Sequence, residues 1–154
     1  MPDWTARSSA LVEIDLYDGA YGPTILLVLV TRRSIDWLRK VFEDMAAAPT
    51  GTVVSLTDLP QVRVVGELGG LVLSKAERCS RPDLVRGVSG RFVWSCTADD
   101  WDTMSLMLEP LLRQPGHQYL TSEGVDDALI EVSFGEALRR RSRGDSAPPS
   151  PACG

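Results

Sequence analysis

His117 is the only histidine among the 154 residues, and most acid-base chemistry in this chain would depend on it. An unperturbed imidazole changes charge near neutral pH, which no other unperturbed side chain does. A serine or cysteine nucleophile would need this base, oriented by a carboxylate such as Asp126 or Asp127. A solitary histidine after Pro115-Gly116 is more typical of a turn residue that hydrogen-bonds to backbone. The sequence therefore argues against most catalytic machinery.

The cysteines predict neither a metal site nor a disulfide framework. Cys79, Cys96 and Cys153 are odd in number and widely spaced, with no C-x-x-C pair. Such usage fits a reducing compartment, and we expect a cytoplasmic protein without metal or cofactor. Cys96 alternates with Phe92 and Trp94 along a predicted strand, which indicates an inert core thiol rather than a nucleophile.

Acidic clusters are the main candidates for a binding surface. Asp99, Asp100 and Asp102 lie at the start of a predicted helix. Asp126 and Asp127 precede the last predicted strand. Capping, turn formation and solvation would explain both clusters, and an acidic docking surface is the functional alternative. An outward leucine near the first cluster could belong to the same surface. We assign partner binding to these side chains: Asp99, Asp100, Asp102, Leu106, Asp126, Asp127 and His117.

The charge is unevenly distributed along the chain. Residues 138–154 carry four arginines and one aspartate, a net charge of +3, so the remaining 12 basic and 20 acidic residues give −8. An acidic body repels nucleic acid and anionic lipid and attracts a basic partner. A net charge of this size is also common in soluble domains for solubility alone.

The N-terminal half reads as a hairpin followed by a helix. Residues 10–17 alternate between apolar and polar side chains, and residues 24–30 are apolar throughout, with turn residues between them. We predict an antiparallel pair whose second strand lies in the middle of the sheet. Ser34 is the predicted N-cap of a helix that ends near Ala48, with one apolar stripe: Ile35, Leu38, Val41, Phe42 and Met45. Trp37 is expected at the boundary of the core.

The second half reads as strands around another helix. Strands are predicted over residues 52–56, 62–68, 71–76 and 91–96, with Gly69-Gly70 as a two-residue hairpin turn. A capping box at Thr97–Asp100 starts the second helix, and Pro110 ends or bends it. His117 to Leu120 forms a short extended piece. The closing strand, residues 127–134, turns these side chains to the core: Ala128, Ile130, Val132 and Phe134.

These elements predict an α+β fold with a single, mostly antiparallel sheet of six or seven strands and two helices packed on it. Residues 1–136 form one domain, and residues 137–154 a basic, Pro/Ser-rich disordered tail. The most apolar run, Ile25 to Val30, is too short to span a bilayer as a helix. No secretory signal is expected at the start, and neither membrane nor nucleic acid is an expected partner.

Three segments carry a family resemblance: P-G-H-Q-Y-L at 115–120, D-D-A-L-I-E-V-S-F-G-E at 126–136, and the tryptophan-bearing helix at 100–112. Together they are similar to the C-terminal part of small bacterial α+β proteins related to immunity proteins of polymorphic toxin systems. The resemblance implies a cytoplasmic protein that neutralises a toxin domain by binding, without catalysis, and it transfers no site residue.

The leading hypothesis is therefore a non-catalytic binding protein whose acidic patches complement a basic toxin domain. Two alternatives stay open. One is a small hydrolase-like enzyme centred on His117, and the other is a self-associating accessory module, a homodimer that uses Leu106 and Trp37.

Overall fold

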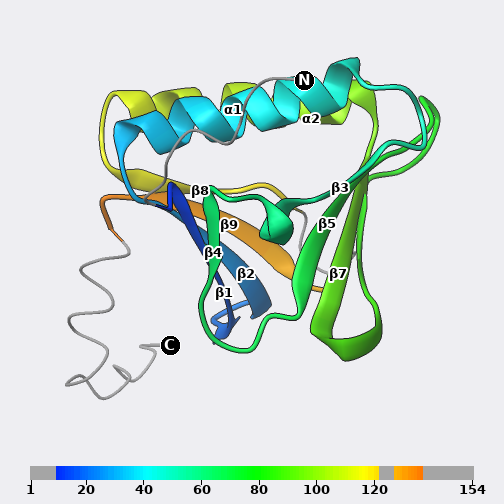
Figure 1. Ribbon diagram of the computed structural model, residues 1–154. Coiled ribbons are helices and arrows are strands. Elements are labelled where there is room, and N and C mark those ends of the chain that lie inside the picture. Colours follow the sequence, from blue (N-terminus) through cyan, green and yellow to red (C-terminus); the bar gives the residue numbers. More distant parts are fainter. Residues whose placement is uncertain (1–9, 122–126, 137–154) are drawn as a thin grey trace.

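The computed structural model describes residues 10–121 and 127–136, which form two sheets beneath one layer of two helices (Figure 1). The helices are α1 (Arg32–Ala47) and α2 (Ala98–Met107). Buried side chains from both helices and both sheets belong to one core cluster. No helix among the described residues has the length and apolar character needed to cross a membrane.

The first sheet has five strands in the order β4-β1-β2-β9-β8. β1 and β2 form the predicted antiparallel hairpin, closed by a turn at Ala20-Tyr21. β2 occupies the centre, as its apolar character on both faces predicts, because β9 pairs with its other edge. In chain order the strands are β1 (Val12–Gly19), β2 (Gly22–Leu29), β4 (Val62–Val64), β8 (Gly116–Tyr119) and β9 (Leu129–Phe134).

The second sheet has four strands in the order β3-β5-β7-β6. Its strands are β3 (Val53–Ser55), β5 (Gly70–Lys75), β6 (Asp83–Arg86) and β7 (Arg91–Cys96). β5 pairs with β3 antiparallel and with β7 parallel, and β6 completes the sheet antiparallel to β7. Phe92, Trp94 and Cys96 share the buried face of β7, as predicted.

The prediction of one mostly antiparallel sheet is wrong. The described strands divide between two sheets, and three of the seven pairings are parallel: β1 with β4, β2 with β9 and β5 with β7. Alternation in a single strand reports its buried face but not its neighbour or the neighbour's direction. The α+β class and the two helices are confirmed.

Gly69-Gly70 is not the predicted hairpin turn. β4 ends at Val64 and pairs with β1 in the other sheet, so it is not the partner of β5. Gly69 instead lies against the backbone at Ser89 and Gly90, where its N–H donates to the Gly90 carbonyl at 2.9 Å. A Cβ on Gly69 would lie 2.0 Å from the Ser89 carbonyl oxygen. The glycine is required for close backbone approach.

Both helices begin with capping boxes, one of them displaced from its predicted position. α2 starts as predicted: the Asp100 carboxylate accepts from the Thr97 N–H at 2.9 Å and from its hydroxyl at 2.7 Å. The predicted N-cap of α1 is wrong, because Thr31 is the cap and Ser34 is the third helical residue. The Ser34 hydroxyl accepts from the Thr31 N–H at 3.1 Å, which is the reciprocal bond of the box.

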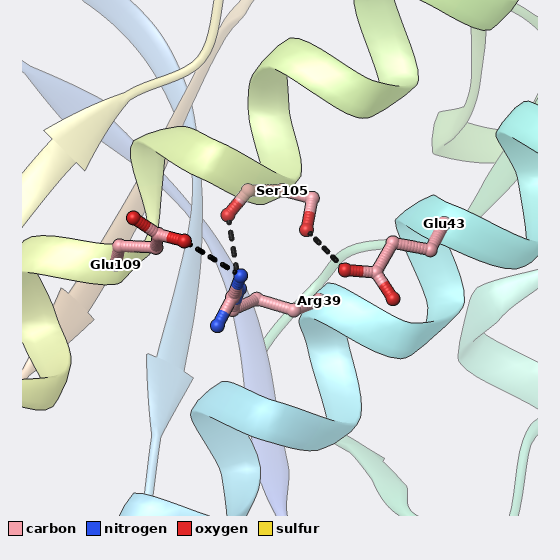
Figure 2. Close-up of polar contacts among 4 residues, drawn as sticks. All are labelled: Arg39, Glu43, Ser105 and Glu109. Atoms are coloured by element: carbon pink, nitrogen blue, oxygen red, sulfur yellow. Dashed lines mark hydrogen bonds and ion pairs between the residues drawn. The ribbon is translucent and has the colours of Figure 1, made fainter.

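Two side-chain bridges join α1 to α2 (Figure 2). Arg39 donates from Nε to the Ser105 carbonyl at 3.2 Å and from its guanidinium to Glu109 at 3.0 Å. The Ser105 hydroxyl donates to Glu43 at 3.0 Å. Arg39 contacts Glu109, whereas Glu43, one turn later in α1, contacts the earlier Ser105. Because the order of the contacts is reversed, the two helices run antiparallel. The bridges satisfy polar groups at the helix–helix contact and fix how the helices are positioned along each other.

Lys75 at the end of β5 caps the C-terminus of α1. Its side chain is 6% exposed, and its ammonium donates to three carbonyl oxygens: Met45 at 3.0 Å, Ala46 at 2.6 Å and Ala48 at 2.8 Å. α1 has no basic residue in its own last turn. The last carbonyls of a helix lack intrahelical partners and carry partial negative charge, so a cation there is stabilising. The sequence pattern predicted the strand but not this contact.

We predict that Lys75→Met destabilises the protein by about 2 kcal/mol, because it leaves buried carbonyls without their charged donor. Urea unfolding followed by circular dichroism measures the loss. Lys40→Met is the matched control: Lys40 is exposed and pairs with Asp44 at 2.6 Å, a hydrogen bond that is the chief reason its pKa is raised. Equal losses in the two variants would contradict the capping role.

Candidate functional site

Three of the predicted partner-binding residues share the exposed face of α2. Asp99, Asp102 and Leu106 follow one another at intervals of three and four residues, which places them on one side of a helix. All three are exposed, and Leu106 points outward as predicted, with 60% of its surface accessible. No lysine or arginine occurs from Thr97 to Leu112. This α2 face is therefore acidic, with one large apolar side chain.

A pocket of about 230 Å³ lies beside the α2 face, between α2, the end of β7, the start of β6 and the residues that follow β8. Most of its buried or half-buried lining is apolar or weakly polar: Trp94, Cys96, Met104, Met107, Leu120 and Thr121. Asp100 is the half-buried charged residue of this lining. Its exposed lining is polar and includes Arg81, Asp83 and Thr103. Thr103 follows Asp99 by four residues, so the α2 face and the pocket are contiguous.

Asp100 belongs to the pocket wall but is already engaged. One of its carboxylate oxygens accepts both hydrogen bonds of the capping box that starts α2. The predicted partner-binding role of Asp100 thus competes with a structural one. Its charge also stabilises the positive end of the helix.

Asp127 lies apart from α2, at the outer edge of β6. Its N–H donates to the Leu84 carbonyl at 3.0 Å, and its carboxylate accepts from the Arg86 N–H at 2.8 Å. Asp127 therefore covers the free edge of β6 and ties the start of β9 to the second sheet. It is exposed, but its carboxylate has this structural partner. Asp126, the other acid predicted here, lies outside the described residues.

His117 lies on the edge strand β8, in neither the pocket nor the α2 face. Its Nδ1 is 2.8 Å from a Glu136 carboxylate oxygen, and its ring meets Tyr119 edge-on at 5.8 Å. The prediction that His117 is a turn residue bonded to backbone is wrong, because it lies in a strand and its side chain contacts a carboxylate. That carboxylate belongs to Glu136 and not to Asp127. In the described part of the chain, no hydroxyl or thiol hydrogen-bonds to the imidazole, so the nucleophile–base contact of a hydrolase triad is not formed there.

Sequence reasoning missed a buried carboxylate on the far face of the five-stranded sheet. Glu131 has no exposed surface and accepts a hydrogen bond from the Tyr17 hydroxyl at 2.7 Å. Ala128, Ile130 and Val132 face the core as predicted, but Glu131 and Ser133, which alternate with them, are buried too. β9 is an internal strand because it lies between β2 and β8, and the alternation within residues 127–134 does not reveal these neighbours.

No group of three or more His, Cys, Asp or Glu side chains among the described residues is placed to hold a metal ion. The comparisons with known proteins gave no match: no family model, no curated protein and no solved structure was found to be similar to the chain. The α2 face and its pocket are accordingly selected on geometry and charge alone.

We predict that Tyr17→Phe destabilises the protein by about 2 kcal/mol, because the fully buried Glu131 loses a hydrogen-bond donor. Chemical unfolding measures the difference. Tyr21→Phe is the control, since Tyr21 is largely exposed and keeps its edge-on ring contact with Tyr119 when only the hydroxyl is removed. A Tyr17→Phe variant as stable as the control would show that the bond contributes nothing.

Proposed function

We propose that the chain is a non-catalytic binding protein, an immunity protein that neutralises a basic toxin domain by docking on the α2 face and its pocket. The observation that carries the proposal is the juxtaposition itself: an exposed acidic helix face with an apolar-floored pocket beside it. The resemblance of residues 100–112 to immunity proteins falls on this same helix.

Charge supports a basic partner. α2 carries Asp99, Asp100 and Asp102 within one turn and no basic residue. A field of one sign at the contact surface accelerates encounter with an oppositely charged protein and orients it on approach. Salt screens such a field, so binding that depends on it weakens as ionic strength rises.

The pocket supports a specific anchor rather than a diffuse electrostatic contact. A few side chains inserted into well-packed pockets dominate the binding energy of most interfaces, and arginine and the aromatic residues are the commonest of them. The lining of Trp94, Met104 and Met107 suits the aliphatic stem of an arginine, and the carboxylates of the adjoining α2 face suit its guanidinium.

The helix also provides a rigid platform. The inner side of α2 packs Trp101 into the core, and Arg39 holds the Ser105 carbonyl near its C-terminal end. A surface that is already ordered loses less conformational entropy when the partner binds. Interfaces of this pre-organised kind change little in backbone conformation on association.

We predict that Asp99→Asn/Asp102→Asn weakens binding to the protein encoded by the neighbouring gene about tenfold at low salt, consistent with the loss of two steering charges. Surface plasmon resonance at low and high salt measures affinity and association rate. Asp58→Asn/Glu67→Gln is a matched control, because it removes two exposed carboxylates outside α2. Binding that is indifferent to salt, or equal losses in the two double variants, would contradict docking on the α2 face.

Thr103→Trp tests the pocket separately from the charge. A large side chain at this exposed position would fill the pocket mouth, and we expect faster dissociation of the complex with little change in association rate, since packing contacts act mainly on dissociation. Val88→Trp, at an exposed site outside the pocket, is the control. Unchanged dissociation in Thr103→Trp would remove the pocket from the interface.

A further inference from the structure

The outer face of the four-stranded sheet carries a ladder made mostly of valines and serines, with one aspartate at its edge. Its register aligns two rows across the strands, which we call the valine face. Partners in register turn their side chains to the same side of a sheet. Because Leu71, Leu73, Phe92 and Trp94 face the core, the alternating positions face outward. The rows are Ser55, Val72, Val93 and Val85, and Val53, Ser74, Ser95 and Asp83. The Ser55 hydroxyl oxygen is itself buried, so the open part of the first row is formed by its three valines.

The valines of this face are unusually open to solvent for β-branched strand residues. Val93, Val85 and Val53 are 38%, 48% and 62% exposed, and Asp83 is the one charged member of the two rows. The body of the chain outside residues 138–154 has a net charge of −8, so two copies repel each other over most of their surfaces. A neutral apolar face is where this repulsion is weakest and where apolar burial can favour contact between copies.

Another chain cannot readily add a strand at either edge of this sheet. Its outer face is therefore the part available for contact with a second copy. Asp127 hydrogen-bonds to the Leu84 carbonyl and to the Arg86 N–H at the outer edge of β6. The opposite edge strand, β3, has only three residues. Covered and very short edges disfavour pairing with another chain through backbone hydrogen bonds.

Opposite charges lie at the two ends of the valine face. Asp83 is level with Ser95 at one end, while Arg91 starts β7 at the other end, where its carbonyl accepts from the Gly87 N–H at 2.6 Å. Within the described residues neither charged side chain forms an ion pair. Two copies can stack face to face about a two-fold axis that lies between them and runs perpendicular to the strands. The strands of one copy then run opposite to those of the other, and Asp83 of each copy lies near Arg91 of the other.

We propose that the valine face is a self-association surface through which two copies of this chain form an isologous dimer. The occupant is a second copy because the face is neutral at its centre and complementary to itself at its ends. β5 and β7 have six residues each, β3 has three and β6 has four. At about 3.3 Å per residue and about 4.8 Å between strands the face measures roughly 300 Å², less than half the usual area per partner in a stable complex. The dimer should therefore be weak and dissociate on dilution.

Sedimentation velocity over a wide concentration range tests the dimer directly. We expect the weight-average sedimentation coefficient to rise with concentration in the unaltered chain and to stay at the monomer value in Val93→Lys. Val30→Lys is the matched control: Val30 is 41% exposed, follows β2 in the other sheet, and should leave association intact. A chain that stays monomeric at every concentration, or a dimer unaffected by Val93→Lys, overturns the proposal.

A charge exchange tests the two-fold arrangement. Asp83→Arg and Arg91→Asp should each weaken association, because each places like charges opposite one another, and the double exchange should restore it. Unfolding curves confirm that all variants are folded. Restoration is not expected from any purely structural defect, and a double exchange no better than the single variants overturns the antiparallel arrangement. The readout is oligomeric state without a partner, so failure here leaves the α2 proposal untouched.

Discussion

One cluster of aromatic rings holds both helices on the four-stranded sheet. Phe42 of α1, Trp94 of β7 and Trp101 of α2 pack with ring centroids 5.0 to 5.7 Å apart, and all three are buried. Aromatic side chains of this size bury large apolar areas and favour edge-on geometry. Because Trp94 also lines the pocket, the same contact that closes the core shapes the floor of the candidate site. The outward direction of the α2 face follows from the burial of Trp101.

Polar side chains also join elements of the fold, and each of the three contacts below links segments that are distant in the sequence. Lys75 binds the carbonyls at the end of α1, Arg39 bridges to α2, and Asp127 covers the edge of β6. In each case a side chain hydrogen-bonds to backbone groups at the end of a helix or the edge of a sheet, where regular structure leaves bonding capacity unused. These contacts explain how the Lys75 ammonium is buried, because three carbonyl oxygens accept its hydrogen bonds.

Local signals in the sequence predicted local structure well. The capping box at Thr97, the β1–β2 hairpin, the buried stripe of α1 and the outward Leu106 all depend on residues close in the chain. The division into two sheets, the parallel pairings and the burial of Glu131 depend on which strands meet, and strand periodicity does not encode the neighbour. For the candidate site, the acids of α2 could be found from sequence, whereas the pocket required Trp94 and Met104 to be brought together from separate elements.

The two surfaces differ in the physics of recognition. The α2 face combines carboxylates with a pocket, which suits fast, salt-sensitive binding of a basic partner with one inserted anchor. The valine face is apolar at its centre and charged only at its ends, so apolar burial contributes most of its attraction and the Asp83–Arg91 contacts add a salt-sensitive part. Asp83 belongs to both, as a pocket-lining residue and as the charged end of the valine face. If both proposed contacts form, this shared residue couples them, so that each contact changes the affinity of the other.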